Sequence, residues 1–230
     1  MKRLHALKDY FTKTEIVLWC SSAGVILLSF FLFDRTHYMT LAASLIGVTS
    51  LILAAKGNPT GQLLMVAFSL LYGMISYHMA YYGEMLTYLG MTMPMAVAAW
   101  IAWLRNPFKG SRSEVRVSTL HRREILPICL LTVLVTVVFY LILAEFDTAN
   151  LLPSTISVST SFLAVYLTYR RSPYFALAYA ANDIVLIVLW VLASLQEIRY
   201  LSVVVCFAAF FVNDLYGFLS WQRMRKRQMG

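Results

Sequence analysis

Two Asn-Asp doublets lie deep inside apolar stretches of this chain, where polar side chains are costly. Asn182-Asp183 lies in the run 174–196 and Asn213-Asp214 in the run 202–222, each run being long enough to cross a lipid bilayer. A carboxylate at that depth costs several kcal/mol unless it is paired, neutralised or facing a polar cavity. The doublets are therefore candidates for a functional site on two consecutive helices.

Helical spacing places further polar and aromatic side chains on the same faces as the doublets. Aromatic planes, amide groups and hydroxyls together suit a flat heteroaromatic ring joined to a polyhydroxylated sugar. The residues that we predict to contact such a substrate lie in the runs 61–82, 86–104, 174–196 and 202–222, and they are Asn182, Asp183, Asn213, Asp214, Tyr179, Trp190, Ser69, Tyr72, Gln62, Trp100 and Tyr216.

A structural role for the same residues is the alternative interpretation. Asn and Asp side chains can hydrogen-bond across the interface of neighbouring membrane helices, and Gly217 would permit a close approach. Aromatic residues at the ends of apolar runs are typical of the interfacial belts of membrane proteins. The residues at such positions are Tyr81, Tyr82, Trp103, Tyr200 and Trp221.

The composition favours lipid as the solvent. Hydrophobic residues make up 60% of the 230-residue chain and charged residues 13%, against roughly 25% charged in an average soluble protein. The net charge of +8 comes from basic residues that flank the apolar runs without forming a continuous patch, so we expect no nucleic-acid partner. The cysteines lack metal-ligand spacing and are interpreted as small buried hydrophobes; they are Cys20, Cys129 and Cys206.

No pattern typical of an enzyme is present. The four histidines lie in or near loops without ligand spacing, and GxSxG, HExxH, P-loop and CxxC patterns are absent. We therefore expect no catalytic site, no metal ion, no cofactor and no self-contained ATP-driven pump. A membrane-embedded enzyme that uses Asp183 and Asp214 as paired acids is the remaining alternative of that class.

The positions of the basic residues indicate how the helices are oriented. Eight apolar runs are candidate spans, at 16–33, 40–55, 61–82, 86–104, 125–145, 154–169, 174–196 and 202–222. The first exceeds a typical signal-peptide segment, so we expect it to remain as a helix. If the N-terminus is cytoplasmic, only Arg35 and Arg199 of the 19 basic residues fall outside, which leaves 17 inside. This predicts a multi-pass protein of a cytoplasmic membrane with both termini in the cytoplasm, and it places Glu84 in an outer loop.

Two halves of the chain resemble each other. Lys56-Gly57-Asn58-Pro59 corresponds to Arg170-Arg171-Ser172-Pro173, and Trp103-Leu104-Arg105 to Trp221-Gln222-Arg223. An odd number of spans in each half, separated by one helix, predicts an all-α integral membrane protein with a parallel 3+1+3 repeat. The predicted parts are an N-terminal segment with the first helix (1–39), a first three-helix bundle (40–104), a basic cytoplasmic loop (105–124), a linker helix (125–153), a second three-helix bundle (154–223) and a basic tail (224–230).

Over roughly residues 40–223 the chain resembles the PnuC family of bacterial vitamin transporters. The resemblance lies in Tyr169-Arg170-Arg171 followed by Asn182, and in the segment Phe-Val-Asn-Asp-Leu-Tyr-Gly-Phe-Leu-Ser-Trp at 211–221. It implies the 3+1+3 fold shared with SWEET transporters, a homotrimer in the bacterial inner membrane, and facilitated diffusion of nicotinamide riboside or a related nucleoside-like vitamin. It also implies a cytoplasmic kinase that phosphorylates and traps the vitamin.

The resemblance is incomplete in the helix that carries the first doublet. Family members that carry nicotinamide riboside show a WxxWxxN pattern, whereas Ala176 and Tyr179 stand at the tryptophan positions here, and Asp183 adds a carboxylate. Thiamine, riboflavin or a deoxynucleoside therefore remain alternative cargoes. Proton-coupled transport that uses Asp183 and Asp214 as protonation sites is a further alternative.

Overall fold

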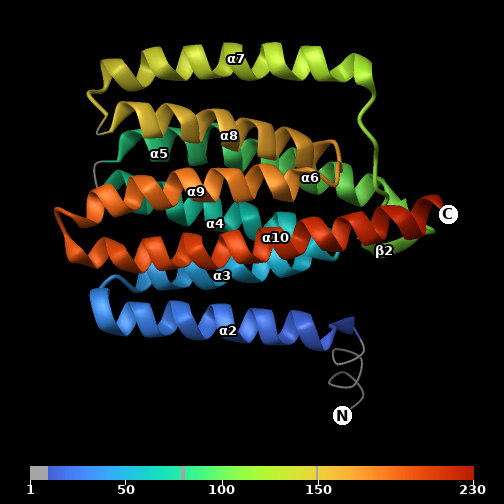
Figure 1. The fold of residues 1–230 in the computed structure, drawn as a ribbon, viewed down its shortest axis with the longest axis horizontal. Coiled ribbons are helices and arrows are strands. Elements are labelled where there is room, and N and C mark those ends of the chain that lie inside the picture. Colours follow the sequence, from blue (N-terminus) through green and yellow to red (C-terminus); the bar gives the residue numbers. More distant parts are fainter. Residues whose placement is uncertain (1–9, 79–80, 149) are drawn as a thin grey trace.

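The computed structural model describes residues 10–78, 81–148 and 150–230, and helices form almost all of it (Figure 1). Within these residues, eight helical segments are long and apolar enough to cross a membrane. The predicted all-α membrane fold with eight spans is confirmed. The elements are α2 (Lys13–Ser29), η1 (Phe30–Asp34), α3 (Tyr38–Ala55), α4 (Pro59–His78), α5 (Tyr82–Leu86), η2 (Thr87–Thr92), α6 (Met93–Arg105), β1 (Pro107–Phe108), β2 (Ser111–Val115), α7 (Arg122–Glu145), α8 (Leu151–Tyr169), α9 (Phe175–Ser194), η3 (Ile198–Tyr200) and α10 (Leu201–Met229).

The helices form two groups of three with two further helices at the periphery. In the first group α4 packs against α3 and α6, and in the second α9 packs against α8 and α10. The groups meet where α10 packs on α3 and where α6 packs on α8. Helix α2 lies against α3 and α10, and α7 lies against α8 at the opposite edge (Figure 1). The predicted division into bundles and the parallel repeat both stay predictions.

The two turns that the sequence marks as equivalent share their backbone conformation. Gly57 and Arg171 both adopt a left-handed conformation, with φ of 68° and 56°. The Gly57 N–H donates to the Ala54 carbonyl at 2.8 Å, and the Arg171 N–H donates to the Thr168 carbonyl at 2.9 Å. A left-handed residue directly after a helix satisfies its last carbonyl groups in this way. Helices α3 and α8 therefore end alike, which supports the repeat.

The basic loop between the two groups contains a short hairpin that the sequence did not predict. Strands β1 and β2 pair in antiparallel fashion, and Val115 at the end of β2 is completely buried. The Val115 N–H donates to the Gly57 carbonyl at 2.9 Å, and the Ser118 N–H donates to the Arg171 carbonyl at 3.0 Å. The loop thus binds to both equivalent turns and joins the two helix groups at this end.

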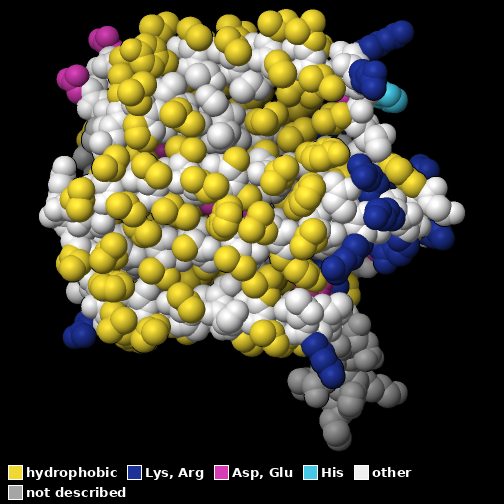
Figure 2. All heavy atoms as spheres, viewed as in Figure 1, with side chains coloured by type: hydrophobic (Ala, Val, Ile, Leu, Met, Phe, Trp, Pro, Cys, Tyr) yellow, Lys and Arg dark blue, Asp and Glu magenta, His cyan; other side chains and the backbone are white. Residues whose placement is uncertain are grey.

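Lys and Arg side chains gather at the end of the bundle that holds the hairpin and the end of α10 (Figure 2). We call this the basic end and the opposite one the far end. Apolar side chains cover the flank between the two ends. Helix α7 shows this most clearly, because only 6% of its most apolar stretch is buried. Such a surface is suited to lipid and not to water.

The prediction that aromatic residues at the helix ends form interfacial belts is wrong for four of the five residues named. Trp103 and Trp221 are 0% exposed, and Tyr81 and Tyr200 are also buried; only Tyr82, at 37%, is exposed. A buried indole N–H needs an acceptor, and the Trp103 N–H finds one in the Thr168 carbonyl at 2.9 Å. Contacts between helices, and not the membrane surface, therefore determine where these four side chains lie.

The fourth span starts earlier and is less regular than the apolar pattern predicts. It begins at Tyr82 and passes through the π-helix η2, where the Met93 N–H donates to the Tyr88 carbonyl five residues back. Pro94 follows and has no N–H to continue a regular α-helix. The early start places Glu84 inside the bundle with 1% exposure, so its assignment to an outer loop is wrong. Helix segments of the π type are frequent at functional sites.

Candidate functional site

A small cavity of about 20 Å³ lies between the two helix groups. Side chains from α3, α4, η2, α8, α9 and α10 line it, so both groups contribute. The lining residues are Leu51, Met65, Phe68, Tyr88, Thr92, Ser161, Tyr179, Asn182, Asp183, Phe207, Phe210 and Asp214. The volume has room for about one water molecule. A larger ligand can enter only if the helices move apart, so this is a closed conformation.

The two acids of the doublets meet at this cavity. Asp183 on α9 and Asp214 on α10 have side chains within hydrogen-bonding reach of each other, and each residue is 4% exposed. Oδ2 of Asp183 has no hydrogen-bond partner among the described residues. Two carboxylates in contact and away from water repel each other strongly, and a proton held between the two side chains or a positively charged ligand removes this repulsion.

Asn182 contributes an amide that α8 holds in one orientation. Its Oδ1 accepts hydrogen bonds from Thr160 Oγ1 at 2.8 Å and from Ser161 Oγ at 3.0 Å. Both hydroxyls come from α8, so the amide is positioned by a neighbouring helix of the same group. With the oxygen occupied, the amide nitrogen remains as a donor for a ligand hydroxyl or carbonyl.

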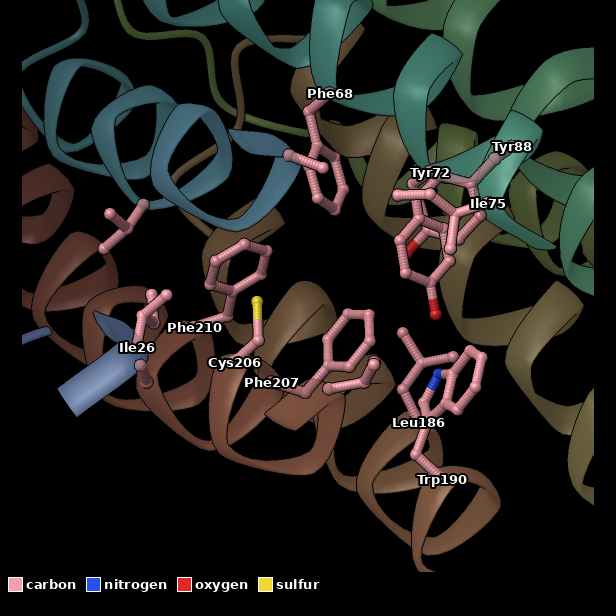
Figure 3. Close-up of a cluster of buried hydrophobic side chains, with 14 of the residues drawn as sticks. Ile26, Phe68, Tyr72, Ile75, Tyr88, Leu186, Trp190, Cys206, Phe207 and Phe210 are labelled. Carbon is pink, nitrogen blue, oxygen red and sulfur yellow. The ribbon is translucent and has the colours of Figure 1, made fainter. Parts of the chain in front are cut away.

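Aromatic rings line part of the cavity and continue beside it. Figure 3 shows Phe68, Tyr72 and Tyr88 from α4 and η2 opposite Phe207 and Phe210 from α10, and all of these except Tyr72 line the cavity. Ring centroids of Tyr72 and Tyr88 lie 4.5 Å apart, and those of Phe68 and Phe210 5.5 Å apart. Such rings can stack against a flat ligand. Of these five, only Tyr72 was among the predicted contact residues.

Some residues that line the cavity are not among the predicted contact residues, and the sequence contains a signal for part of them. Phe207, Phe210 and Asp214 follow helical spacing, so the face of Asp214 predicts Phe207 and Phe210 as its neighbours. Tyr88 lies in the π-helix, where the regular period fails, and only Pro94 marks that irregularity in the sequence.

Other predicted contact residues lie near the cavity without lining it. Ser69 and Tyr72 are buried on the same face of α4 as the lining residues Met65 and Phe68. Trp190 is completely buried, with its ring centroid 6.2 Å from that of Tyr72. These side chains extend the site towards the far end of the bundle.

Four predicted contact residues do not line the cavity. Asn213 donates from Nδ2 to Ser22 Oγ on α2 at 2.8 Å, and the Tyr216 hydroxyl donates to Glu15 Oε1 on α2 at 3.2 Å. Gln62 is buried in the first turn of α4, and Trp100 is partly buried on α6. The structure therefore brings Asn182, Asp183, Asp214 and Tyr179 together, while these four lie outside the cavity lining.

Glu15 on α2 forms an ion pair with Lys56, directly after α3, beside Tyr216. Lys56 Nζ lies 3.1 Å from Glu15 Oε2, and the Glu15 carboxylate also accepts the Thr12 N–H at 2.8 Å. This acid is therefore neutralised by a base, unlike the acids at the cavity. No group of three or more His, Cys, Asp or Glu side chains in the described ranges is placed to hold a metal ion.

The sequence model of one family, described as nicotinamide mononucleotide transporter, matches residues 37–223. The matched region includes every residue that lines the cavity. Helix α2, which lies before residue 37, is outside it.

Two further comparisons identify one similar protein and one similar solved structure. The chain is 25% identical over 205 residues to the nicotinamide riboside transporter PnuC of Neisseria mucosa, and the match covers 87% of this chain and 78% of that protein. It also resembles the crystal structure of the vitamin B3 transporter PnuC, with a TM-score of 0.82 and 22% identity. This second match covers 95% of this chain and 94% of the other, and at that identity it shows a shared fold.

Proposed function

The chain belongs to the nicotinamide mononucleotide transporter family, and we propose that its substrate is nicotinamide riboside or a closely related nucleoside-like vitamin. The chain is a multi-pass membrane protein and a transporter. Its similarity to a nicotinamide riboside transporter over most of both chains supports the choice of substrate. We propose facilitated diffusion, in which the closed cavity opens alternately to the two sides of the membrane.

The observation that carries this proposal is the chemical make-up of the central cavity. Nicotinamide riboside has a flat, positively charged pyridinium ring, a carboxamide and a ribose. Rings such as Phe68 and Phe210 can stack on the pyridinium, and the Asp183–Asp214 pair can offset its charge. Asn182 can donate a hydrogen bond to a ribose hydroxyl or to the carboxamide.

Aromatic contacts join the two helix groups on either side of the cavity, towards both ends of the bundle. At the basic end the rings of Trp103 and Trp221 lie 5.3 Å apart, and at the far end those of Tyr81 and Trp190 lie 4.9 Å apart. In each pair the first residue belongs to the first half of the chain and the second to the other. Opening one contact while the other stays closed would expose the cavity to a single side of the membrane.

The basic end is proposed to face the cytoplasm of a bacterium, in the inner membrane, with both termini inside. The family resemblance further supports a homotrimer and a cytoplasmic kinase that phosphorylates the vitamin after uptake. Such a kinase acts on the released product, so it needs no physical contact with this chain.

Calorimetry of the purified protein with nicotinamide riboside tests the substrate, and uptake into proteoliposomes tests transport. Saturable binding, and uptake that stops when inside and outside concentrations are equal, are the expected results. Binding of thiamine, riboflavin or a deoxynucleoside without binding of nicotinamide riboside would replace the proposed substrate with the bound compound.

The contact between Asp183 and Asp214 favours one alternative mechanism, proton-coupled transport. A carboxyl pair that shares a proton can release it when a positively charged substrate arrives. An imposed pH gradient across proteoliposomes distinguishes the two mechanisms. Accumulation of substrate above its equilibrium level indicates coupling, and an unchanged final level supports facilitated diffusion.

A further inference from the structure

The acidic side chains of the described residues divide according to their neighbours. Two lie exposed near the far end, Glu145 and Asp147. Five others lie within ion-pair distance of a basic side chain, in the pairs Glu15–Lys56, Asp34–His37, Glu114–Arg227, Glu124–Arg170 and Glu197–Arg199. Three acids remain that are buried and lie beside no basic side chain of the described ranges: Glu84, Asp183 and Asp214.

Glu84 is the one of these three that the sequence did not point to. It is 1% exposed, and its carboxyl group faces the hydroxyl of Ser157 on α8. Neither carboxyl oxygen makes a hydrogen bond of good geometry with the described residues. A buried carboxyl group left in this way costs free energy that a positively charged ligand could offset.

Polar groups connect Glu84 to the central pair. Ser157 and Ser161 lie one helical turn apart on α8, and both are buried. Ser161 donates to Asn182 at the cavity, directly beside Asp183 in the chain. The hydroxyl group of Tyr88 is close enough to interact electrostatically with both Glu84 and Asp183. Buried polar groups, those of Ser157, Ser161 and Asn182, therefore lie between Glu84, towards the far end, and the acid pair.

We infer that this interior selects its substrate by positive charge, with Glu84 as an outer binding group and Asp183 and Asp214 as the central ones. The inference rests on the proposed function, since it concerns the ring of the same substrate. No Lys, Arg or His of the described residues lines the cavity, so a cation meets carboxyl groups, hydroxyls, the Asn182 amide, aromatic faces and two aliphatic side chains there, and no like charge. Aromatic faces also attract cations, which adds to the same selectivity.

A matched pair of ligands tests this inference. Nicotinamide riboside carries a cationic pyridinium ring, whereas its 1,4-dihydro form is neutral and has the same ribose and carboxamide. We expect wild-type protein to bind the cation at least about tenfold more tightly than the dihydro form, as measured by calorimetry. This comparison needs no substitution, so it does not depend on whether a variant folds.

Variants then assign the preference to particular acids. The double variant Asp183→Asn with Asp214→Asn removes both central carboxyl groups, and with them the negative charge of the pair, so it should bring the affinity ratio close to one. Glu84→Gln should lower the ratio to a value between that variant and the wild type. Glu145→Gln is the matched control, because it removes an exposed carboxyl group at the far end, and it should leave the ratio unchanged. Binding of the neutral ligand serves as the check that each variant is folded.

The outcomes separate this inference from the proposed function. Equal affinity of the wild type for both ligands overturns the selection by charge and leaves the substrate class standing. If Glu84→Gln binds the two ligands with the same affinity ratio as the wild type, Glu84 does not contribute to the selection by charge. A lack of binding of both ligands overturns the proposed substrate, and the inference with it.

Discussion

Trp103 and Trp221 link the two helix groups at the basic end, because each donates a hydrogen bond to a helix of the other group. The Trp103 N–H donates to the Thr168 carbonyl at the end of α8, and the Trp221 N–H donates to the Ala54 carbonyl at the end of α3, at 2.9 and 2.8 Å. Ala54 and Thr168 each lie three residues before the left-handed residue that ends their helix. The two tryptophans thus occupy equivalent positions in the two halves of the chain, and each connects its own half to the other by a hydrogen bond.

We predict that Trp221→Phe lowers the stability of the protein by about 1–3 kcal/mol, because a buried hydrogen bond is lost and the smaller ring leaves a void. Thermal unfolding in detergent measures this, and Trp103→Phe should behave alike. Tyr140→Phe, at an exposed position on α7, is the control and should leave the unfolding temperature unchanged. An unfolding temperature equal to that of the wild type in both tryptophan variants would contradict the proposed role.

The two asparagines of the doublets should now respond differently to the same substitution. Asn182→Ala removes an amide at the cavity, so we expect monodisperse protein that binds nicotinamide riboside about 5- to 150-fold more weakly, equivalent to roughly 1–3 kcal/mol. Asn213→Ala removes the hydrogen bond to Ser22, so we expect lower thermal stability and nearly normal affinity. Calorimetry and thermal unfolding of both variants check the contrast. The opposite pattern would mean that Asn213 and not Asn182 contacts the ligand.

Lys56→Met should destabilise the protein because it leaves the Glu15 carboxylate buried without its base. The loss of one partner of a buried ion pair costs up to about 3–5 kcal/mol. Arg227→Met is the matched control, since the Arg227 side chain is 63% exposed beside Glu114, and exposed pairs contribute about 0–1 kcal/mol. The double variant Glu15→Gln with Lys56→Met should recover part of the loss. Equal effects of the two single variants would show that the Glu15–Lys56 pair acts like a surface pair.

The orientation of the chain can be tested by cysteine labelling in a cysteine-free background. Arg112→Cys lies at the exposed hairpin of the basic end and Asp147→Cys at the exposed far end. With a membrane-impermeant reagent, we expect Asp147→Cys to react in intact cells and Arg112→Cys only after the membrane is opened. Reaction of Arg112→Cys in intact cells would reverse the proposed orientation.

The sequence alone determined which segments are long and apolar enough to cross the membrane, and which residues in them cost free energy to place inside a bilayer. Stretches such as Phe175–Ser194 are apolar because a helix that crosses a bilayer faces lipid or other helices and not water, and the apolar run can be read without knowing which. Asp183 and Asp214 are recognisable for the same reason, since bulk water does not hydrate a carboxyl group at that depth. The grouping of basic residues at one end likewise follows from the chain and its membrane.

Only the tertiary structure decided which of the polar residues meet. Asp214 and Asn213 are neighbours in the chain, but the rotation of α10 turns the first towards the cavity and the second towards α2. The apolar pattern weakens near Glu84, so the sequence predicts a loop there. The burial of Glu84 depends on the early start of α5 and on packing against α8. Such directions depend on how whole helices rotate and pack against each other, and no single stretch of sequence contains that information.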